Sequence, residues 1–222
     1  MNIKLLDKSI SACGNEIPCF IYNSNKNNAI RILFLGVTHG EEPQGKFLIE
    51  KFMKEIEKKQ LSFDNDLYFI PCLNPDGMDK KQRGNSNNVD LNRNFPAKNY
   101  EVTSFDDGTT SGEYANSEKE TQFLTKIIEK YNFDIILSFH APFEIVNYDG
   151  PAQNIAKEIS KITGYPIQAD IGYPTPGSFG TFCGVERNIP TITLEVSEKL
   201  TNEELWQQNK DIFEYLGNLK MN

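Results

Sequence analysis

The only two histidines of the 222-residue chain each lie where an apolar run ends. His39 follows the run FLGVT and precedes Glu42 by three residues, whereas His140 comes directly after FDIILSF. Two imidazoles and one carboxylate, with a fourth position open to water or substrate, form a typical catalytic zinc site. A short H-x-x-E match is common by chance, and a lone histidine is more often a core or surface residue. The zinc interpretation therefore depends on the remaining motifs.

Residues so far apart in the chain need a rigid frame that brings them together. Short apolar runs alternate with longer amphipathic stretches, which is typical of an α/β protein whose helices cover a largely buried sheet. The carboxyl ends of strands in such sheets open into the crevice where ligands bind, and His39, His140 and Glu195 fall at or near such ends. The predicted strands are residues 17–22, 30–37, 67–73, 133–139 and 190–196.

Four amphipathic stretches predict helices. The first has Pro43 in its first turn, where a proline is tolerated. Ser117 precedes Glu120 with the spacing of a capping box, and Thr201 and Glu204 repeat that spacing at the last helix. The predicted helices are residues 42–58, a segment that begins at 117, residues 151–162 and residues 201–218.

Two long stretches, 74–116 and 164–184, lack apolar periodicity and are rich in polar residues, glycine and proline. Loops of this length inside a compact domain are usually functional or disordered. Within the first of them, NPDG predicts a type I turn with Pro75 at its second position. We expect this turn to aim the loop.

The overall composition limits the classes of molecule that we expect the protein to bind. A formal net charge of −8 and a pI near 4.9 argue against nucleic acid or an anionic membrane and favour a small ligand. No apolar stretch matches a signal peptide or a membrane span, so we expect a cytoplasmic protein with one domain over residues 1–222. The cysteines lack metal-type spacing and are expected to be buried free thiols: Cys13, Cys19, Cys72 and Cys183.

Six motifs occur in the order known from one enzyme family. Together they resemble the zinc metallocarboxypeptidases typified by pancreatic carboxypeptidase A, and NPDG and DLNRNFP are the most specific of them. The resemblance implies a mixed parallel and antiparallel twisted sheet flanked by helices on both faces. The motifs are THGEE (38–42), NPDG (74–77), RGNSNNVDLNRNFP (83–96), YANSEKET (114–121), SFHAP (138–142) and TLEVSE (193–198).

The resemblance also implies roles for individual residues. It implies one zinc ion per chain, held by His39, Glu42 and His140, which is the ligand set known for carboxypeptidase A. It makes Glu195 the general base, outside the metal shell, and Arg83 the electrophilic clamp. These roles agree with the chemistry, because a carboxylate can take a proton from water and a guanidinium can stabilise an oxyanion.

The substrate-binding residues are implied in the same way. Asn92 and Arg93 would grip the terminal carboxylate of a peptide, since an arginine can hold a carboxylate through two parallel hydrogen bonds. Glu41 stands where carboxypeptidase A has an arginine, so a positive subsite is replaced by an acid. Tyr173 is the candidate for the family's mobile tyrosine. For an arbitrary arginine or tyrosine in such loops, a surface or core role would be the simpler interpretation.

The segments HAPFEIVNYDGPA and GYPTPGSFGT are most similar to the murein tripeptide amidases of bacteria. This similarity implies hydrolysis of the γ-D-Glu–meso-diaminopimelate bond in the cell-wall tripeptide L-Ala-γ-D-Glu-meso-diaminopimelate. The partner would be a small peptide with a free terminal carboxylate. An acid such as Glu41 or Asp149 would meet the distal ammonium of the substrate.

Two other functions remain open at this stage. Enzymes of the succinylglutamate desuccinylase and aspartoacylase type share H-x-x-E zinc ligation and an N-R pair, but they act on N-acyl amino acids. The full RGN…VDLNRNFP run favours the peptidase. A catalytically silent zinc- or peptide-binding module is disfavoured because TLEVSE retains an acid at Glu195. Oligomeric state has no signature in the sequence.

Overall fold

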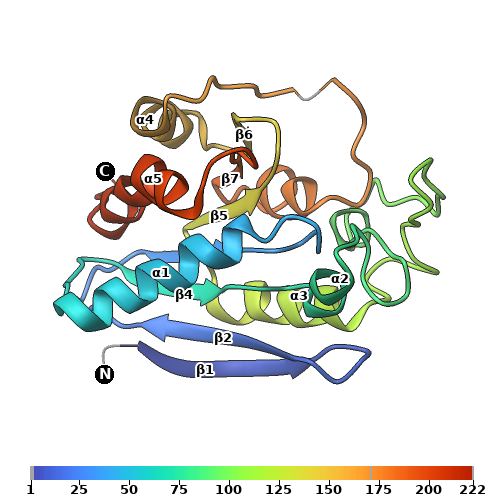
Figure 1. Ribbon diagram of the computed structural model, residues 1–222, viewed down its shortest axis with the longest axis horizontal. Helices are drawn as coiled ribbons and strands as arrows, with labels where there is room; N and C mark the ends of the chain where they lie inside the picture. Colours follow the sequence, from blue (N-terminus) through green and yellow to red (C-terminus); the bar gives the residue numbers. More distant parts are fainter. Residues whose placement is uncertain (1–2, 171, 222) are drawn as a thin grey trace.

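Seven strands form one mixed sheet in a computed structural model of the chain, which describes residues 3–170 and 172–221 (Figure 1). Four central strands are parallel, and the strands toward both edges pair antiparallel. From one edge to the other the strands are β1 (Ile3–Ile10), β2 (Glu16–Tyr22), β4 (Asp66–Ile70), β3 (Arg31–Leu35), β5 (Ile135–His140), β7 (Thr191–Glu195) and β6 (Ile145–Asp149).

Helices cover both faces of this sheet, as expected for the fold class (Figure 1). Ile32 and Phe34 of β3 point into the core cluster that contains the side chains of α1, α4 and α5, whereas Leu33 and Leu35 point into the cluster that contains those of α3. Strands buried on both faces read as nearly continuous apolar runs. The helices are α1 (Gln44–Lys59), α2 (Pro75–Lys80), α3 (Lys119–Tyr131), α4 (Gln153–Thr163) and α5 (Asn202–Gly217), with a 3₁₀ turn η1 (Leu91–Arg93) and a π-helical turn η2 (Thr181–Val185).

All five predicted strands and four predicted helices are present, within a few residues of the predicted limits. The strands β1 and β6 were not predicted. Both lie at sheet edges, where only part of each strand is buried and polar residues interrupt the apolar pattern. Residue 171, in the predicted loop 164–184, lies outside the described residues, and the end of this loop forms η2.

The two predicted capping boxes have different outcomes. The box at α5 is confirmed, because Glu204 N donates to Thr201 Oγ1 and Thr201 N donates to the Glu204 carboxylate. The box at α3 is wrong. The helix begins after Glu118, and the Ser117 hydroxyl donates to the Glu118 carboxylate instead of accepting from the helix. A capping motif works only if the chain enters the helix at that residue.

The cysteines are free thiols, and three of them are buried as predicted. Cys13 is exposed, so that part of the prediction is wrong. It lies in the turn between β1 and β2, outside any apolar run. Among the described residues, none of the helices combines the length and apolar character needed to cross a lipid bilayer.

The NPDG segment forms the first turn of α2 instead of an isolated type I turn. Asn74 caps the helix, with its side-chain oxygen accepting from Gly77 N at 2.9 Å. A type I turn and the first turn of a helix have similar backbone angles, so the local conformation was predicted and its continuation was missed.

Asp76 ties α2 to the turn between β1 and β2. Its buried carboxylate accepts from Ser11 Oγ at 2.5 Å, Asn15 Nδ2 at 2.9 Å and Cys13 N at 3.0 Å. Burial alone would raise the pKa of Asp76, but the hydrogen bonds from these neighbours outweigh it and lower the pKa from 3.8 to about 2. The charged form is therefore favoured in the folded state.

We predict that Asp76→Asn lowers the free energy of unfolding by about 2 kcal/mol at pH 7, the equivalent of the change in pKa. Because the folded-state pKa is depressed, this contribution is complete above pH 3.8 and disappears as the pH falls through about 2. Urea unfolding at pH 7 and pH 3 measures the difference. Asp211→Asn, at an exposed position on α5, is the charge-matched control. A difference that is constant with pH would contradict the assignment.

Candidate metal centre and active site

The order of the strands creates a crevice between the ends of β3 and β5. From β3 the chain crosses through α1 to β4 on one side of β3, and α3 then leads it back to β5 on the other side. The strand order therefore reverses at β3, which has β4 on one side and β5 on the other, and ligands typically bind at such a switch point. His39 lies four residues beyond β3, and His140 is the last residue of β5.

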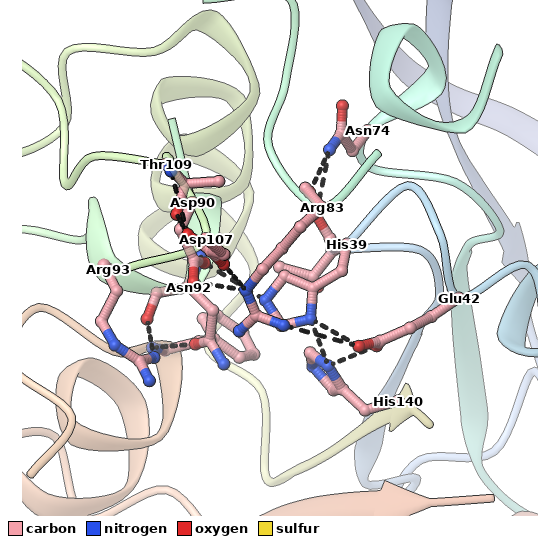
Figure 2. A network of polar contacts seen from close by, with 12 residues as sticks. His39, Glu42, Asn74, Arg83, Asp90, Asn92, Arg93, Asp107, Thr109 and His140 are labelled. Atoms are coloured by element: carbon pink, nitrogen blue, oxygen red, sulfur yellow. Dashed lines mark hydrogen bonds and ion pairs between the residues drawn. The ribbon is translucent and has the colours of Figure 1, made fainter. Parts of the chain in front are cut away.

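The backbone turn that leads to His39 is strained. Val37 has φ +51°, a left-handed conformation that is unfavourable for a β-branched residue. Val37 O accepts from Asn74 N at 2.9 Å, and Asn74 Nδ2 donates to the carbonyl oxygens of Thr38 and Arg83, each at 3.3 Å. Asn74 of NPDG thus joins the loop of His39 to the loop of Arg83 (Figure 2).

His39, Glu42 and His140 converge on one point, as predicted (Figure 2). Glu42 Oε1 lies 2.9 Å from His39 Nδ1, Glu42 Oε2 lies 2.9 Å from His140 Nδ1, and the two Nδ1 atoms are 3.2 Å apart. All three side chains are buried. Two neutral imidazoles facing a carboxylate need a proton or a cation between them, so this donor set fits a divalent metal such as zinc.

Asp90 contacts the ring nitrogen of His39 that does not face Glu42. Asp90 Oδ1 lies 3.2 Å from His39 Nε2, which fixes the ring so that Nδ1 faces Glu42. Burial would lower the pKa of His39, but the carboxylates of Glu42 and Asp90 outweigh it and raise the pKa to about 9. Asp90 was not identified from the sequence, although it begins the quoted motif DLNRNFP. Its distance of 51 residues from His39 hides the contact.

Arg83 lies beside the centre, with acids around its guanidinium. Arg83 Nε donates to Asp90 Oδ2 at 2.9 Å, and one terminal nitrogen lies 3.8 Å from Glu42 and 3.9 Å from Glu41. Asp107 Oδ2 is 3.6 Å from Nε. Asp90 therefore bridges His39 and Arg83, which holds the guanidinium at the metal centre (Figure 2).

Glu195 lies on the strand next to His140. It is the last residue of β7 and pairs in register with His140 on β5, so the two side chains begin on strands about 4.8 Å apart. Its Oε2 is buried and, within the described parts of the chain, has no hydrogen-bond partner. Burial raises the pKa of Glu195. A carboxylate held in this state is ready to accept a proton.

Asn92 and Arg93 lie in the 3₁₀ turn η1, which Asp90 caps by accepting from Asn92 N at 2.8 Å. Asn92 Oδ1 accepts from Phe179 N at 2.9 Å, so this side chain also positions the segment before η2. The Arg93 guanidinium donates to Asn92 O at 2.8 Å and lies 6.0 Å from the Phe105 ring. The remaining guanidinium N–H groups can bind a carboxylate.

One cavity of about 530 Å³ collects these residues, a volume suited to a small ligand. Glu41 and Tyr173 lie on its wall and are half-exposed. All sequence-predicted site residues line the cavity: His39, Glu41, Glu42, Arg83, Asn92, Arg93, His140, Tyr173 and Glu195. Asp90, Asp107 and Asp149 line it as well.

We predict that Asp90→Asn weakens zinc binding by about 10- to 100-fold, because the neutral amide no longer orients His39 with a charge-assisted hydrogen bond. Competition with a zinc chelator measures the affinity. Asp107→Asn is the matched control, since Asp107 faces Arg83 but makes no contact with His39 among the described residues. Equal losses in both variants would show that Asp90 acts only through Arg83.

Comparisons with known proteins agree with this geometry. A family model for zinc carboxypeptidases matches residues 4–162, which include the metal centre, Arg83 and Arg93 but end before Glu195. Murein peptide amidase A of Vibrio campbellii is 33% identical over 201 residues, which cover 84% of this chain and 78% of that protein. Murein peptide amidase A of Escherichia coli K12 is 30% identical over 174 residues, covering 73% and 69%.

Solved structures share the fold. The murein-tripeptide amidase MpaA from Escherichia coli O157 superimposes with a TM-score of 0.78 at 23% identity, over 100% of this chain and 94% of that chain. Carboxypeptidase A from Helicoverpa armigera gives 0.78 at 18% identity, over 97% and 67%. With its sheet, its His-Glu-His cluster and the family match over residues 4–162, the chain belongs to the zinc carboxypeptidase family and is a hydrolase whose cofactor is zinc.

Proposed function

We propose that the protein hydrolyses the γ-D-Glu–meso-diaminopimelate bond of the murein tripeptide L-Ala-γ-D-Glu-meso-diaminopimelate. The similarity to two murein peptide amidases over most of the chain supports this substrate class. The observation that carries the chemistry is the convergence of His39, Glu42 and His140 next to the strand of Glu195, whose buried Oε2 has no hydrogen-bond partner among the described residues.

In this proposal His39, Glu42 and His140 hold the zinc ion. A bound zinc ion polarises the scissile carbonyl and lowers the pKa of a water molecule to about 7. Asp90 keeps the His39 ring oriented and balances the charge of Arg83. These contacts fix the centre before substrate arrives, so no reorganisation is needed during the reaction.

Glu195 acts as the general base and then as the general acid. It takes a proton from the attacking water as the new C–O bond forms, and it gives that proton to the leaving amine as the C–N bond breaks. Its raised pKa, caused by burial, suits both transfers. Arg83 stabilises the negative charge that develops on the carbonyl oxygen. In comparable sites such a contact stabilises the transition state by about 3 kcal/mol.

Arg93 and Asn92 hold the carboxylate of the leaving amino acid, which sets the register of the bond to be cut. The pre-formed turn η1 supports this role, because it keeps both residues on the cavity wall. Tyr173 closes over the substrate from the loop before η2, and Glu41 contacts the part of the substrate near Arg83.

The proposal includes a single catalytic domain over residues 1–222 in the cytoplasm. One sheet holds His140 and Glu195 and leads, through the loop after β3, to His39 and Glu42, which supports one domain. The unpaired thiols of Cys19, Cys72 and Cys183 are typical of a reducing compartment.

We predict that the zinc-loaded protein releases free diaminopimelate from the tripeptide and that a chelator abolishes the release. Glu195→Gln should lower the rate by at least about 100-fold while keeping its zinc, because the base is not a ligand. Mass spectrometry of the products and the zinc content per chain are the two measurements.

Glu129→Gln, at an exposed position on α3, is the matched control and should keep the full rate. A Glu195→Gln variant with an unchanged rate would refute the role of the base. Release of amino acids from N-succinylglutamate or N-acetylaspartate, without cleavage of the tripeptide, would identify an N-acyl amino acid deacylase instead.

A further inference from the structure

The connection from β5 to β6 passes over the end of the strand that carries Glu195. In the sheet β7 lies between β5 and β6, so residues 141–144, which join these two strands, must cross the carboxyl end of β7. Glu195, the last residue of β7, pairs with His140 on one side and with Ile145 on the other. This crossover (residues 141–144) therefore passes the strand end at the position of Glu195.

The crossover ends at Glu144, whose backbone is strained. Glu144 has φ +57°, a left-handed conformation that is unfavourable for a residue with a side chain. Its carboxylate accepts a hydrogen bond from Ser197 Oγ at 2.8 Å, and the exposed Lys199 Nζ lies 3.7 Å away. Exposed ion pairs contribute little, whereas a hydrogen bond to a carboxylate is charge-assisted. The buried Ser197 is thus the main contact that holds Glu144.

Ser197 is held in turn by a buried tyrosine. Ser197 N donates to Tyr165 Oη at 3.0 Å, and Tyr165 Oη donates to Gln208 Oε1 on α5 at 2.8 Å. Gln208 Nε2 donates to Thr163 O, at the end of α4, at 3.0 Å. The hydrogen bonds from Tyr165 through Ser197 to Glu144, called the Ser197 link below, therefore fasten the crossover to two helices.

The crossover contacts both the cavity and the proposed base. Ala141, Pro142 and Phe143 line the cavity. Burial raises the pKa of Glu195, and a hydrogen bond from the backbone N–H group of Phe143 opposes that rise. Since Phe143 directly precedes Glu144, a shift of the crossover would move this N–H group relative to the Glu195 carboxylate.

We infer that Ser197 and Glu144 are positioning residues whose hydrogen bond, supported by Tyr165, holds residues 141–144 across the end of β7 and keeps the Glu195 carboxylate aligned with the attacking water. This inference rests on the proposed function, in which Glu195 is the base. Within the described part of the chain, the cavity wall does not include Ser197, Glu144 or Tyr165, so they act through their neighbours. A displacement of a reacting group by about 1 Å can slow a reaction by about 100-fold.

The first test measures kcat and KM of zinc-loaded variants with the murein tripeptide. Ser197→Ala should lower kcat by about 10- to 100-fold and leave KM within about twofold, because the base loses its alignment while the substrate contacts remain. Glu144→Ala should have the same effect, and the double variant should be no slower than either single variant, because both changes remove one contact. Glu144→Gln keeps an acceptor oxygen for Ser197 and should stay within about threefold of the unaltered kcat.

Ser24→Ala is the matched control. Ser24 Oγ donates to Asp66 Oδ1 at 2.8 Å, which is the same chemistry and length as the contact between Ser197 and Glu144. Asp66 is the first residue of β4, so this hydrogen bond lies at the amino end of the parallel strands, away from the cavity. The variant should keep the unaltered kcat.

Hydrogen–deuterium exchange of the zinc-loaded proteins, followed by mass spectrometry, tests the Ser197 link without turnover. Ser197→Ala should accelerate amide exchange at least about 10-fold in peptides that cover 141–146 and 194–198, and Ser24→Ala should not. If the unaltered protein does not cleave the tripeptide but this local acceleration occurs, the proposed reaction fails and the link itself stands. An unchanged kcat in Ser197→Ala, or a lowered kcat with faster exchange throughout the chain, would overturn the positioning role.

Discussion

The structure depends on the close approach of three buried side chains that all donate electron pairs, namely His39, Glu42 and His140. The Nδ1 atoms of His39 and His140 lie 3.2 Å apart and share the carboxylate of Glu42. Without a proton or a metal ion between them these atoms would repel one another, and their side chains are largely removed from solvent. The fold must therefore hold them together by other means, and the positive charge of a bound metal then becomes strongly favourable.

The topology of the sheet holds these three side chains together, and contacts between loops support it. The reversal of strand order at β3 and β5 places the residues that carry the imidazoles at one crevice, and the register of β5 with β7 adds Glu195 beside His140. The strained Val37 is stabilised by the hydrogen bond from Asn74 N to its carbonyl oxygen. Asp76 in turn fastens α2 to the first hairpin, so a region far from the metal contributes to the geometry of the centre.

Charges in the cavity fall into two groups. Asp90 and Arg83 neutralise each other and the metal ligands, which gives a rigid, pre-organised frame. Glu195 and Asp149 have no such partners among the described residues, and both have a pKa raised by burial. The carboxylate oxygen of Glu195 that the protein leaves without a hydrogen bond is available for the proton that the proposed reaction transfers.

Local sequence patterns were enough to predict most of the strands, helices and cavity-lining residues of this protein. Apolar runs and helical periodicity identified the central strands and main helices, and motifs such as HGEE and DLNRNFP identified the residues that line the cavity. The edge strands β1 and β6 were not predicted, and the predictions of the α3 capping box and of a buried Cys13 were wrong. Weakly buried segments carry little sequence pattern. The bridge made by Asp90 and the isolation of Asp149 were decided only by tertiary structure. Both are properties of distances between residues far apart in the chain, and no local spacing encodes such distances.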